Sequence, residues 1–275
     1  MIKRVNMRIE LLTQLSHIGD EKTGSTPVLR TMTIFKDGRH IRIPYISGNA
    51  IRGLMRRLLM HDFFEVVGVE PSTKLYHVFF AGGILERGQE SEIDIAFKRK
   101  VRDTIPPLAL FGAAFSNQMI QGSLVVEHAI PIARETAHFI RFSGGLIEED
   151  IDNAKYPIRT FTDIEFFTRR DDLGRDEGDD VVQMKVEHEV LIAGTVLVSG
   201  FVLRHASELE VSCLAHALDL LSTWGAVGGK SSVGLGRIAI KTDIDSDSQK
   251  YIEFVRNNRD EIKFVLFEMN KRLEK

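Results

Sequence analysis

The pattern of hydrophobic and polar residues predicts four strands. The first covers residues 2–15, and its apolar residues fall on one face at every second position: Val5, Met7, Ile9 and Leu11. Runs rich in Val, Ile and Leu predict the other strands at 124–132, 186–204 and 237–242. The polar stretch 16–40 predicts a long loop, with a hairpin around Asp37-Gly38.

Apolar residues at helical spacing predict three helices. Ser47-Gly48-Asn49 begins the first, and its buried stripe is expected to consist of Ile51, Leu54, Met55, Leu58 and Leu59. Three arginines fall off that stripe: Arg52, Arg56 and Arg57. The second helix begins with a capping box, in which Ser207 and Glu210 each satisfy a free amide, and ends before Gly225. The third covers about 247–273.

The order strand, helix, strand, strand, helix, strand is that of the ferredoxin-like fold, which RRM-type RNA-binding domains use. We therefore predict an α+β fold in which residues 1–275 form a single RRM-like domain. Two long insertions interrupt this domain, at about 63–108 and 133–186. The end of the second insertion, residues 169–180, is almost wholly charged and predicts a solvated loop tip.

Composition adds limits to this picture. The chain is 43% hydrophobic, which is enough to build a core, and its single cysteine, Cys213, is expected to be buried. The net charge of −3 is not typical of a nucleic-acid-binding protein, so a nucleic-acid site would have to come from local clustering of cations. No apolar run is long enough to cross a bilayer, and no signal peptide is visible, so we expect a cytoplasmic protein without a membrane partner.

The first candidate site is the start of the helix at Ser47. The free amides and partial positive charge of a helix start suit a phosphate. Ser47 and Asn49 add hydrogen-bonding groups, while Arg52 and Arg56 lie one turn apart and can contact neighbouring phosphates. An ordinary capped amphipathic helix with solvated arginines would show the same pattern.

The second candidate site is a glycine-rich loop, residues 225–236. Gly229-Lys230-Ser231 resembles the end of a P-loop, but Trp224 stands where the first glycine should be. A P-loop also leads from a strand into a helix, and here a helix leads into a strand. The loop suits close approach to an RNA backbone, with Lys230 as a point charge. A glycine-rich turn without function is the alternative.

These segments also carry a resemblance to the RAMP superfamily. Residues 43–53 look like the helix start of these proteins, and Leu110-Phe-Gly112 followed by Gly122-Ser-Leu is similar to their central segment. Residues 228–237 resemble the glycine-rich loop that precedes the last strand of the superfamily. The size of the chain and its two insertions look most like the CRISPR "Cas seven" backbone group.

The resemblance implies a non-catalytic, RNA-binding subunit of a CRISPR effector complex, with a right-hand shape. An RRM-like palm would carry a finger or lid (63–108) and a thumb hairpin (133–186) that wedges between guide bases. The implied partners are CRISPR guide RNA, complementary target nucleic acid, further copies in a helical filament and other effector subunits. The expected RNA contacts are Lys22, Ser47, Asn49, Arg52, Arg56, Arg57, Phe166, Phe167, Arg169, Arg170, Gly228, Gly229, Lys230, Ser231 and Ser232. Phe166 and Phe167 are equally consistent with local core of the insertion.

Catalysis by this chain is the alternative. Some members of the group cleave target RNA with an aspartate in the first long loop. The stretch of this chain that matches their pattern, Gly24-Ser25-Thr26-Pro27, is one residue short and has no aspartate. Asp20 is the nearest carboxylate that could support a metal-dependent endoribonuclease. The nine histidines show no zinc-type spacing, so we expect neither a metal nor another cofactor.

Overall fold

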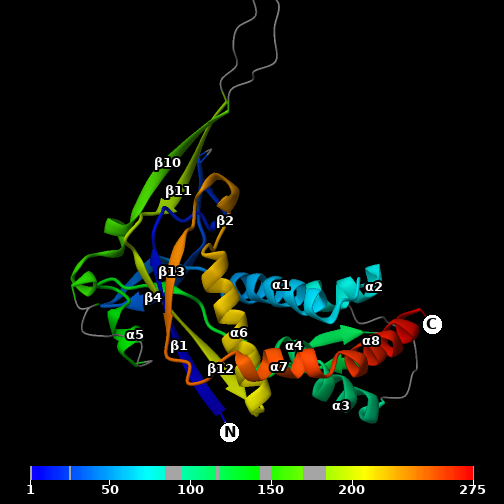
Figure 1. The fold of residues 1–275 in the computed structure, drawn as a ribbon. Helices are drawn as coiled ribbons and strands as arrows, with labels where there is room; N and C mark the ends of the chain where they lie inside the picture. Colours follow the sequence, from blue (N-terminus) through cyan, green and yellow to red (C-terminus); the bar gives the residue numbers. More distant parts are fainter. Residues whose placement is uncertain are drawn as a thin grey trace, which may run out of the picture.

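A computed structural model describes residues 2–24, 26–83, 94–115, 118–142, 150, 152–169 and 184–274, with only the backbone described at residues 141, 142, 169 and 184. Figure 1 shows a sheet flanked by helices, with a long hairpin projecting from one end of it. The charged tip predicted at 169–180 lies, apart from the backbone of Arg169, outside the described residues.

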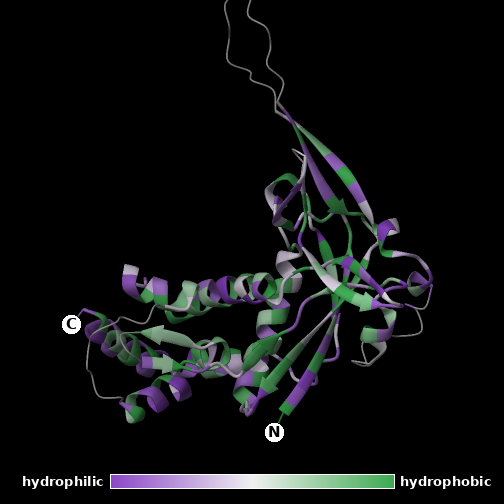
Figure 2. Cartoon of the chain, turned by 180° about the vertical axis from the view of Figure 1, so that it is seen from behind, coloured by the Kyte–Doolittle hydropathy of each residue, from purple (hydrophilic) through white to green (hydrophobic). Residues whose placement is uncertain are grey.

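The central sheet has the strand order β13-β1-β12-β8, and all neighbours are antiparallel. Its strands are β1 (Ile2–Leu11), β8 (Leu124–Val126), β12 (Val196–Arg204) and β13 (Ile238–Thr242), with β9 (Ile130–Pro131) also pairing with β12. The predicted apolar face of β1 is buried. In the rear view, β1 alternates between hydrophilic and hydrophobic residues beside the more uniformly hydrophobic β12 (Figure 2).

Two predicted strands are each broken in two. The segment 186–204 divides into the end of β11 (Met184–Leu191) and β12, because the chain turns at Gly194, which has a positive φ of 81°. The segment 124–132 divides into β8 and β9, and His128 lies between them with its ring turned toward the start of α1.

Helices α1 (Gly48–Val67) and α6 (Glu208–Trp224) pack against each other and contribute to one continuous hydrophobic core with the sheet. The predicted third helix is two helices, α7 (Gln249–Asn257) and α8 (Arg259–Leu273), because Asn258 leaves the helical conformation. The capping box of α6 forms only in part. Ser207 Oγ accepts from the Glu210 amide at 3.2 Å, whereas the Glu210 carboxylate pairs with Arg102 at 2.9 Å.

The polar stretch after β1 is two hairpins rather than a long loop. They consist of β2 (Ile18–Thr23) with β3 (Thr26–Leu29) and β4 (Thr31–Lys36) with β5 (Arg39–Pro44). The predicted turn at Asp37-Gly38 is confirmed: both residues have positive φ angles, 51° and 74°, as a two-residue hairpin turn requires.

The first insertion forms short elements around the far ends of α1 and α8 (Figure 1). They are α2 (Thr73–Tyr76), the π-helix η1 (His77–Ala81), α3 (Ile95–Thr104), α4 (Pro106–Phe111) and the hairpin of β6 (Ala113–Phe115) and β7 (Gln118–Ile120). Since α1 continues to Val67, Phe63 and Phe64 belong to the main core.

The second insertion contains the projecting hairpin. It begins with α5 (Ala137–Phe142) and two short 3-10 helices, η3 (Asn153–Lys155) and η4 (Ile158–Phe161), and continues into β10 (Thr162–Arg169), which pairs with β11. The side of β11 contacts β3, where Glu189 accepts from the Leu29 amide at 2.9 Å. The hairpin is thus braced at its base by the β2–β3 hairpin.

Candidate nucleic-acid interface

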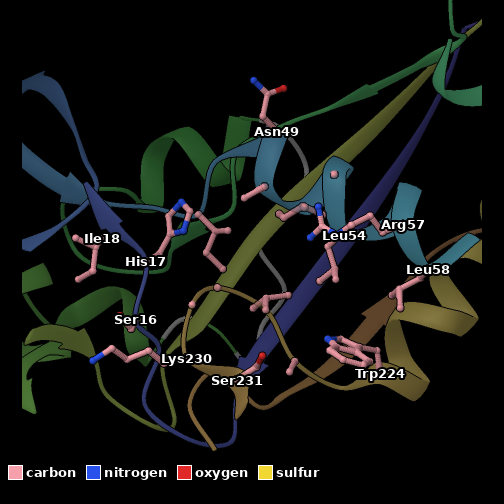
Figure 3. Close-up of a pocket in the computed structure, with 18 of the residues that line it drawn as sticks. Ser16, His17, Ile18, Asn49, Leu54, Arg57, Leu58, Trp224, Lys230 and Ser231 are labelled. Atoms are coloured by element: carbon pink, nitrogen blue, oxygen red, sulfur yellow. The ribbon is translucent and has the colours of Figure 1, made fainter. Parts of the chain in front are cut away.

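A groove of about 760 Å³ brings the two candidate segments together. One wall is the first half of α1, and the other is the end of α6 with the glycine-rich loop (Figure 3). The segment after β1, Ser16 to Ile18, closes one side. Among the described residues that line this groove there is no Asp or Glu, whereas Arg57, Lys230 and two histidines do line it. Although acidic residues outnumber lysines and arginines in the whole chain, the charged residues in the described lining of this groove are all basic.

The glycine-rich loop is held by backbone contacts to the segment that follows β1. The Gly229 amide donates to the Ser16 carbonyl at 2.7 Å, and the Gly236 amide donates to the Gln14 carbonyl at 2.7 Å. Gly228 has a φ of 80°, and a Cβ there would lie 2.6 Å from the Ser16 oxygen. Gly228 and Gly236 are required by the packing of the loop, because a Cβ at position 236 would overlap the Val227 carbonyl. The Gly229 amide is already paired within the protein. Ser231 and Ser232, in the short 3-10 helix η5 (Ser231–Val233), are exposed and carry hydroxyl groups that a ligand can reach.

Two histidines accept hydrogen bonds from backbone amides at the start of α1. The Ser47 amide donates to His17 Nε2 at 3.3 Å, and the Gly48 amide donates to His128 Nδ1 at 2.9 Å. Ser47 Oγ caps the helix by accepting from the Ala50 amide at 3.2 Å, as predicted. Two amides that the sequence leaves open for phosphate therefore already have acceptors. Asn49 extends exposed from this turn at the edge of the groove (Figure 3).

His17 makes the stability of this helix start sensitive to pH. Burial, and then the charge of Arg30, hold the pKa of His17 below its ordinary value. A lowered histidine pKa means that the unfolded chain binds the proton more readily, so stability is present above the ordinary pKa and is lost as the pH falls. Protonation would also replace the acceptor for the Ser47 amide with a donor.

We expect the midpoint of thermal unfolding to fall as the pH is lowered from about 7.5 to about 5.5, either side of the ordinary histidine pKa of about 6.5. His17→Gln retains an acceptor without titrating, so the fall should be smaller in this variant. His77→Gln, at an exposed histidine, is the control and should behave as the unmodified chain does. An equal fall in all three proteins would contradict this role of His17.

The three arginines of α1 have different environments. Arg57 is exposed and lines the groove. Arg56 is only 5% exposed, and its guanidinium donates to the carbonyls of Phe79 (3.2 Å), Phe111 (2.8 Å) and Gly112 (2.7 Å). Arg52, partly buried, also donates to the Phe111 carbonyl. The prediction that Arg56 lies off the buried face was wrong, because the first insertion packs on that side of α1.

Two of the carbonyls that Arg56 binds, those of Phe111 and Gly112, belong to the predicted Leu-Phe-Gly segment. Gly112, with a φ of 69°, and Gly122 approach so closely that a Cβ on either would lie 2.6 Å from the amide nitrogen of the other. Burial and the charge of Arg52 lower the pKa of Arg56 to about 10, so it stays a cation at neutral pH. Arg56 thus joins α1 to this segment.

Arg56→Met should lower the free energy of unfolding by about 3 kcal/mol or more. The reason is that the carbonyls of Phe79 and Gly112 lose the guanidinium donor, and the Phe111 carbonyl keeps only Arg52. Arg57→Met, at the next position of the same helix, should change it by less than about 0.5 kcal/mol. Urea denaturation of the two variants measures the difference. Equal values would show that the Arg56 contacts do not stabilise the fold.

The base of the projecting hairpin contacts the glycine-rich loop. Lys230 Nζ lies 3.9 Å from the centroid of the Phe167 ring, which in turn packs edge-on against His188. Phe166 points to the other side of the strand and is 51% exposed, with Lys185 Nζ 4.2 Å from its ring centroid. Phe166 is therefore the aromatic ring that remains open to solvent, whereas Phe167 positions Lys230.

Of the remaining expected contacts, the structure describes the side chain of Lys22, which is not among the residues that line the groove. Lys22 is exposed on β2, in the hairpin that braces β11. Arg169 is described only as backbone, and Arg170 lies outside the described residues. Asp20 is also exposed on β2, where Arg42 forms an ion pair with its neighbour Glu21.

Sequence reasoning missed His17 and Trp224. Both line the groove, and both are brought there by segments distant from α1 in the chain. Trp224 is the only tryptophan of the chain and directly precedes the glycine that ends α6. This position was the one sequence feature that could have marked it as a candidate site residue.

Within the described ranges, no group of three or more His, Cys, Asp or Glu side chains is placed to hold a metal ion. In the same part of the chain, no helix combines the length and apolar character needed to span a membrane.

Comparisons with known proteins place this geometry in context. A family model described as the RAMP superfamily matches residues 8–239. Among solved structures, the chain is similar to a chain of a "Type IV-B CRISPR Complex", with 22% identity and a TM-score of 0.61. The match covers 88% of this chain and 91% of that chain. No curated protein matches the sequence.

Proposed function

Because the chain belongs to the RAMP superfamily, we propose that it binds CRISPR guide RNA as a backbone subunit of an effector complex. The observation that carries the proposal is the groove between α1 and the glycine-rich loop, where none of the described lining residues is acidic. Cations at its edge can neutralise phosphates, and a strand of RNA can follow it from the base of the hairpin to the middle of α1. The similar solved chain comes from a CRISPR complex, which supports this assignment.

The proposed palm is the central sheet with α1 and α6. The strand order of this sheet, last-first-third-second among its four main strands, supports a ferredoxin-like palm. The hairpin of β10 and β11 is the proposed thumb, since it projects from one end of the sheet (Figure 1). Phe166 on this hairpin can stack on a splayed guide base. The elements between α1 and β8 are the proposed finger.

The proposed RNA contacts include the expected residues that are exposed, namely Lys22, Asn49, Arg57, Phe166, Ser231 and Ser232. Ser47 and Lys230, which are partly exposed, belong to the same set. Arg169 and Arg170 are proposed from the sequence alone. Arg52 and Arg56 instead support the fold through carbonyl contacts. Gly228 is required by the packing of the loop, and the Gly229 amide is paired with the Ser16 carbonyl. We assign no catalytic step to Asp20.

Copies of the chain are proposed to follow one another head to tail along the guide, which presents the RNA to a complementary target. A repeated contact between unlike surfaces produces an open helix rather than a closed ring. Other effector subunits would bind at the ends and along this filament.

Filter binding of the purified chain to a short single-stranded RNA tests the RNA-binding step. The affinity should fall linearly on a logarithmic scale between about 50 and about 200 mM salt, with a slope of about −0.7 per phosphate neutralised. Binding without salt dependence, or no binding at the lower salt, would contradict the proposed use of the groove.

A further inference from the structure

The indole of Trp224 is large, half exposed and without a described partner. It is 53% exposed, at the point where α6 ends at Gly225, which has a φ of 63°. Within the described residues, the ring takes part in no aromatic contact and no hydrogen bond. An aromatic side chain of this size gains stability when its faces are covered, so its exposure here indicates a surface that a ligand can complete.

The surroundings of this ring are apolar on one side. Leu54 and Leu58 of α1 line the wall of the groove opposite the ring (Figure 3). Ala226 and Val227 also line the groove. The groove volume of about 760 Å³ is within the range of roughly 300–1,000 Å³ typical of small-ligand sites. A phosphate group alone would leave these apolar surfaces uncovered, whereas a flat aromatic group would cover them.

The edge of the groove is polar and cationic. Arg57, Lys230 and Asn49 lie along it, and no carboxylate lines it among the described residues. Trp224 also lines a neighbouring hollow of about 500 Å³ whose lining includes Ser232 and Arg237, so a further cation lies close to the ring. An aromatic group attached to anions on both sides matches this arrangement, and a nucleotide within a single strand has this chemistry.

We propose that Trp224 is a stacking platform for one unpaired nucleobase of the bound RNA, which enters the groove between the indole and the leucines of α1. The sugar-phosphate backbone on either side of this base would lie near Arg57 and Arg237. Stacking on an aromatic face tolerates any base, which suits a guide whose sequence varies. This inference rests on the proposed RNA binding and adds a base site on the palm, separate from Phe166 on the hairpin.

The single tryptophan makes the site directly measurable. The purified full chain is titrated with an end-labelled single-stranded RNA, and the anisotropy of the label is recorded together with the tryptophan emission. We expect the emission to be quenched with the same dissociation constant that anisotropy reports. An RNA of equal length with abasic residues should bind through its phosphates but leave the emission largely unchanged.

Variants give the second readout. Trp224→Ala should bind the RNA roughly tenfold to hundredfold more weakly, and Trp224→Phe should restore much of the affinity. Phe267→Ala, which removes an exposed aromatic ring on α8, is the matched control and should bind as the unmodified chain does. Circular dichroism checks that each variant is folded.

The possible failures can be told apart. RNA binding by anisotropy with unchanged tryptophan emission and unchanged affinity in Trp224→Ala would overturn the base site and leave the proposed function standing. No change in anisotropy would overturn both. A shift of the emission with protein concentration, before RNA is added, would show that a second copy of the chain covers the ring and would overturn the base site.

Discussion

Reversing the charges of Arg57 and Lys230 together is expected to weaken the binding of single-stranded RNA by at least about 100-fold, with each reversal contributing about tenfold or more. Both side chains line the groove. Each reversal removes an attraction to a phosphate and adds a repulsion of similar size. The measurement is the dissociation constant of Arg57→Glu/Lys230→Glu at low salt, with circular dichroism to verify the fold.

The matched control reverses two exposed cations on the C-terminal helices, in Arg256→Glu/Lys263→Glu. The two double variants have the same net charge, so a general electrostatic effect would weaken both equally. We expect the control to lose little affinity. If the two variants bind RNA equally well, the groove is not the RNA site.

Gly236→Ala is expected to lower the free energy of unfolding by more than about 3 kcal/mol. Gly236 has a φ of 74°, and a Cβ at this position would overlap the carbonyl oxygen of Val227. The Val227 amide donates to the Gly236 carbonyl at 2.8 Å, so the two ends of the glycine-rich loop cannot separate without losing this bond. The substitution would therefore open the loop that carries Lys230.

Gly234→Ala separates backbone strain from this steric overlap. Gly234 has a φ of 88°, but no atom lies within 4 Å of the position of its Cβ. Alanine there should cost only the strain of a positive φ, about 1 kcal/mol. Chemical denaturation of both variants provides the comparison, and equal losses would show that the contact with Val227 is not what requires glycine at 236.

Local patterns predicted the elements of the palm because they act within a few residues. The apolar spacing and Ser47 predicted the start of α1, and alternation predicted the buried face of β1. The turn at Asp37-Gly38 was predictable because its residue types favour the positive φ angles that the turn needs. These predictions required no knowledge of which segments meet.

The pairing of distant segments could not be predicted in the same way. Arg56 resembles a solvated arginine in the helical pattern and becomes buried only because η1 and α4 place their carbonyls against it. The capping box at Ser207 is incomplete because Arg102, from another helix, competes for the Glu210 carboxylate. In both places a tertiary contact determined the outcome.

The candidate site shows the same division. The glycine-rich loop and the start of α1 were identified separately from their residue types, and the structure brings them to one groove. The histidines that accept hydrogen bonds at that helix start come from segments distant in the sequence, and the spacing of residues along the chain does not reveal that these segments meet. Trp224 is at the groove for the same reason. The motifs thus located the surface, while its detailed composition required the structure.

Co-expression of the chain with a CRISPR array, followed by sequencing of the RNA that purifies with it, tests the central claim most directly. The account predicts a discrete small RNA of uniform length that derives from the array, and its loss in Arg57→Glu/Lys230→Glu but not in Arg256→Glu/Lys263→Glu. Purification of the folded chain without RNA, or with RNA of random origin and length, would contradict the claim that this protein is a guide-RNA-binding subunit.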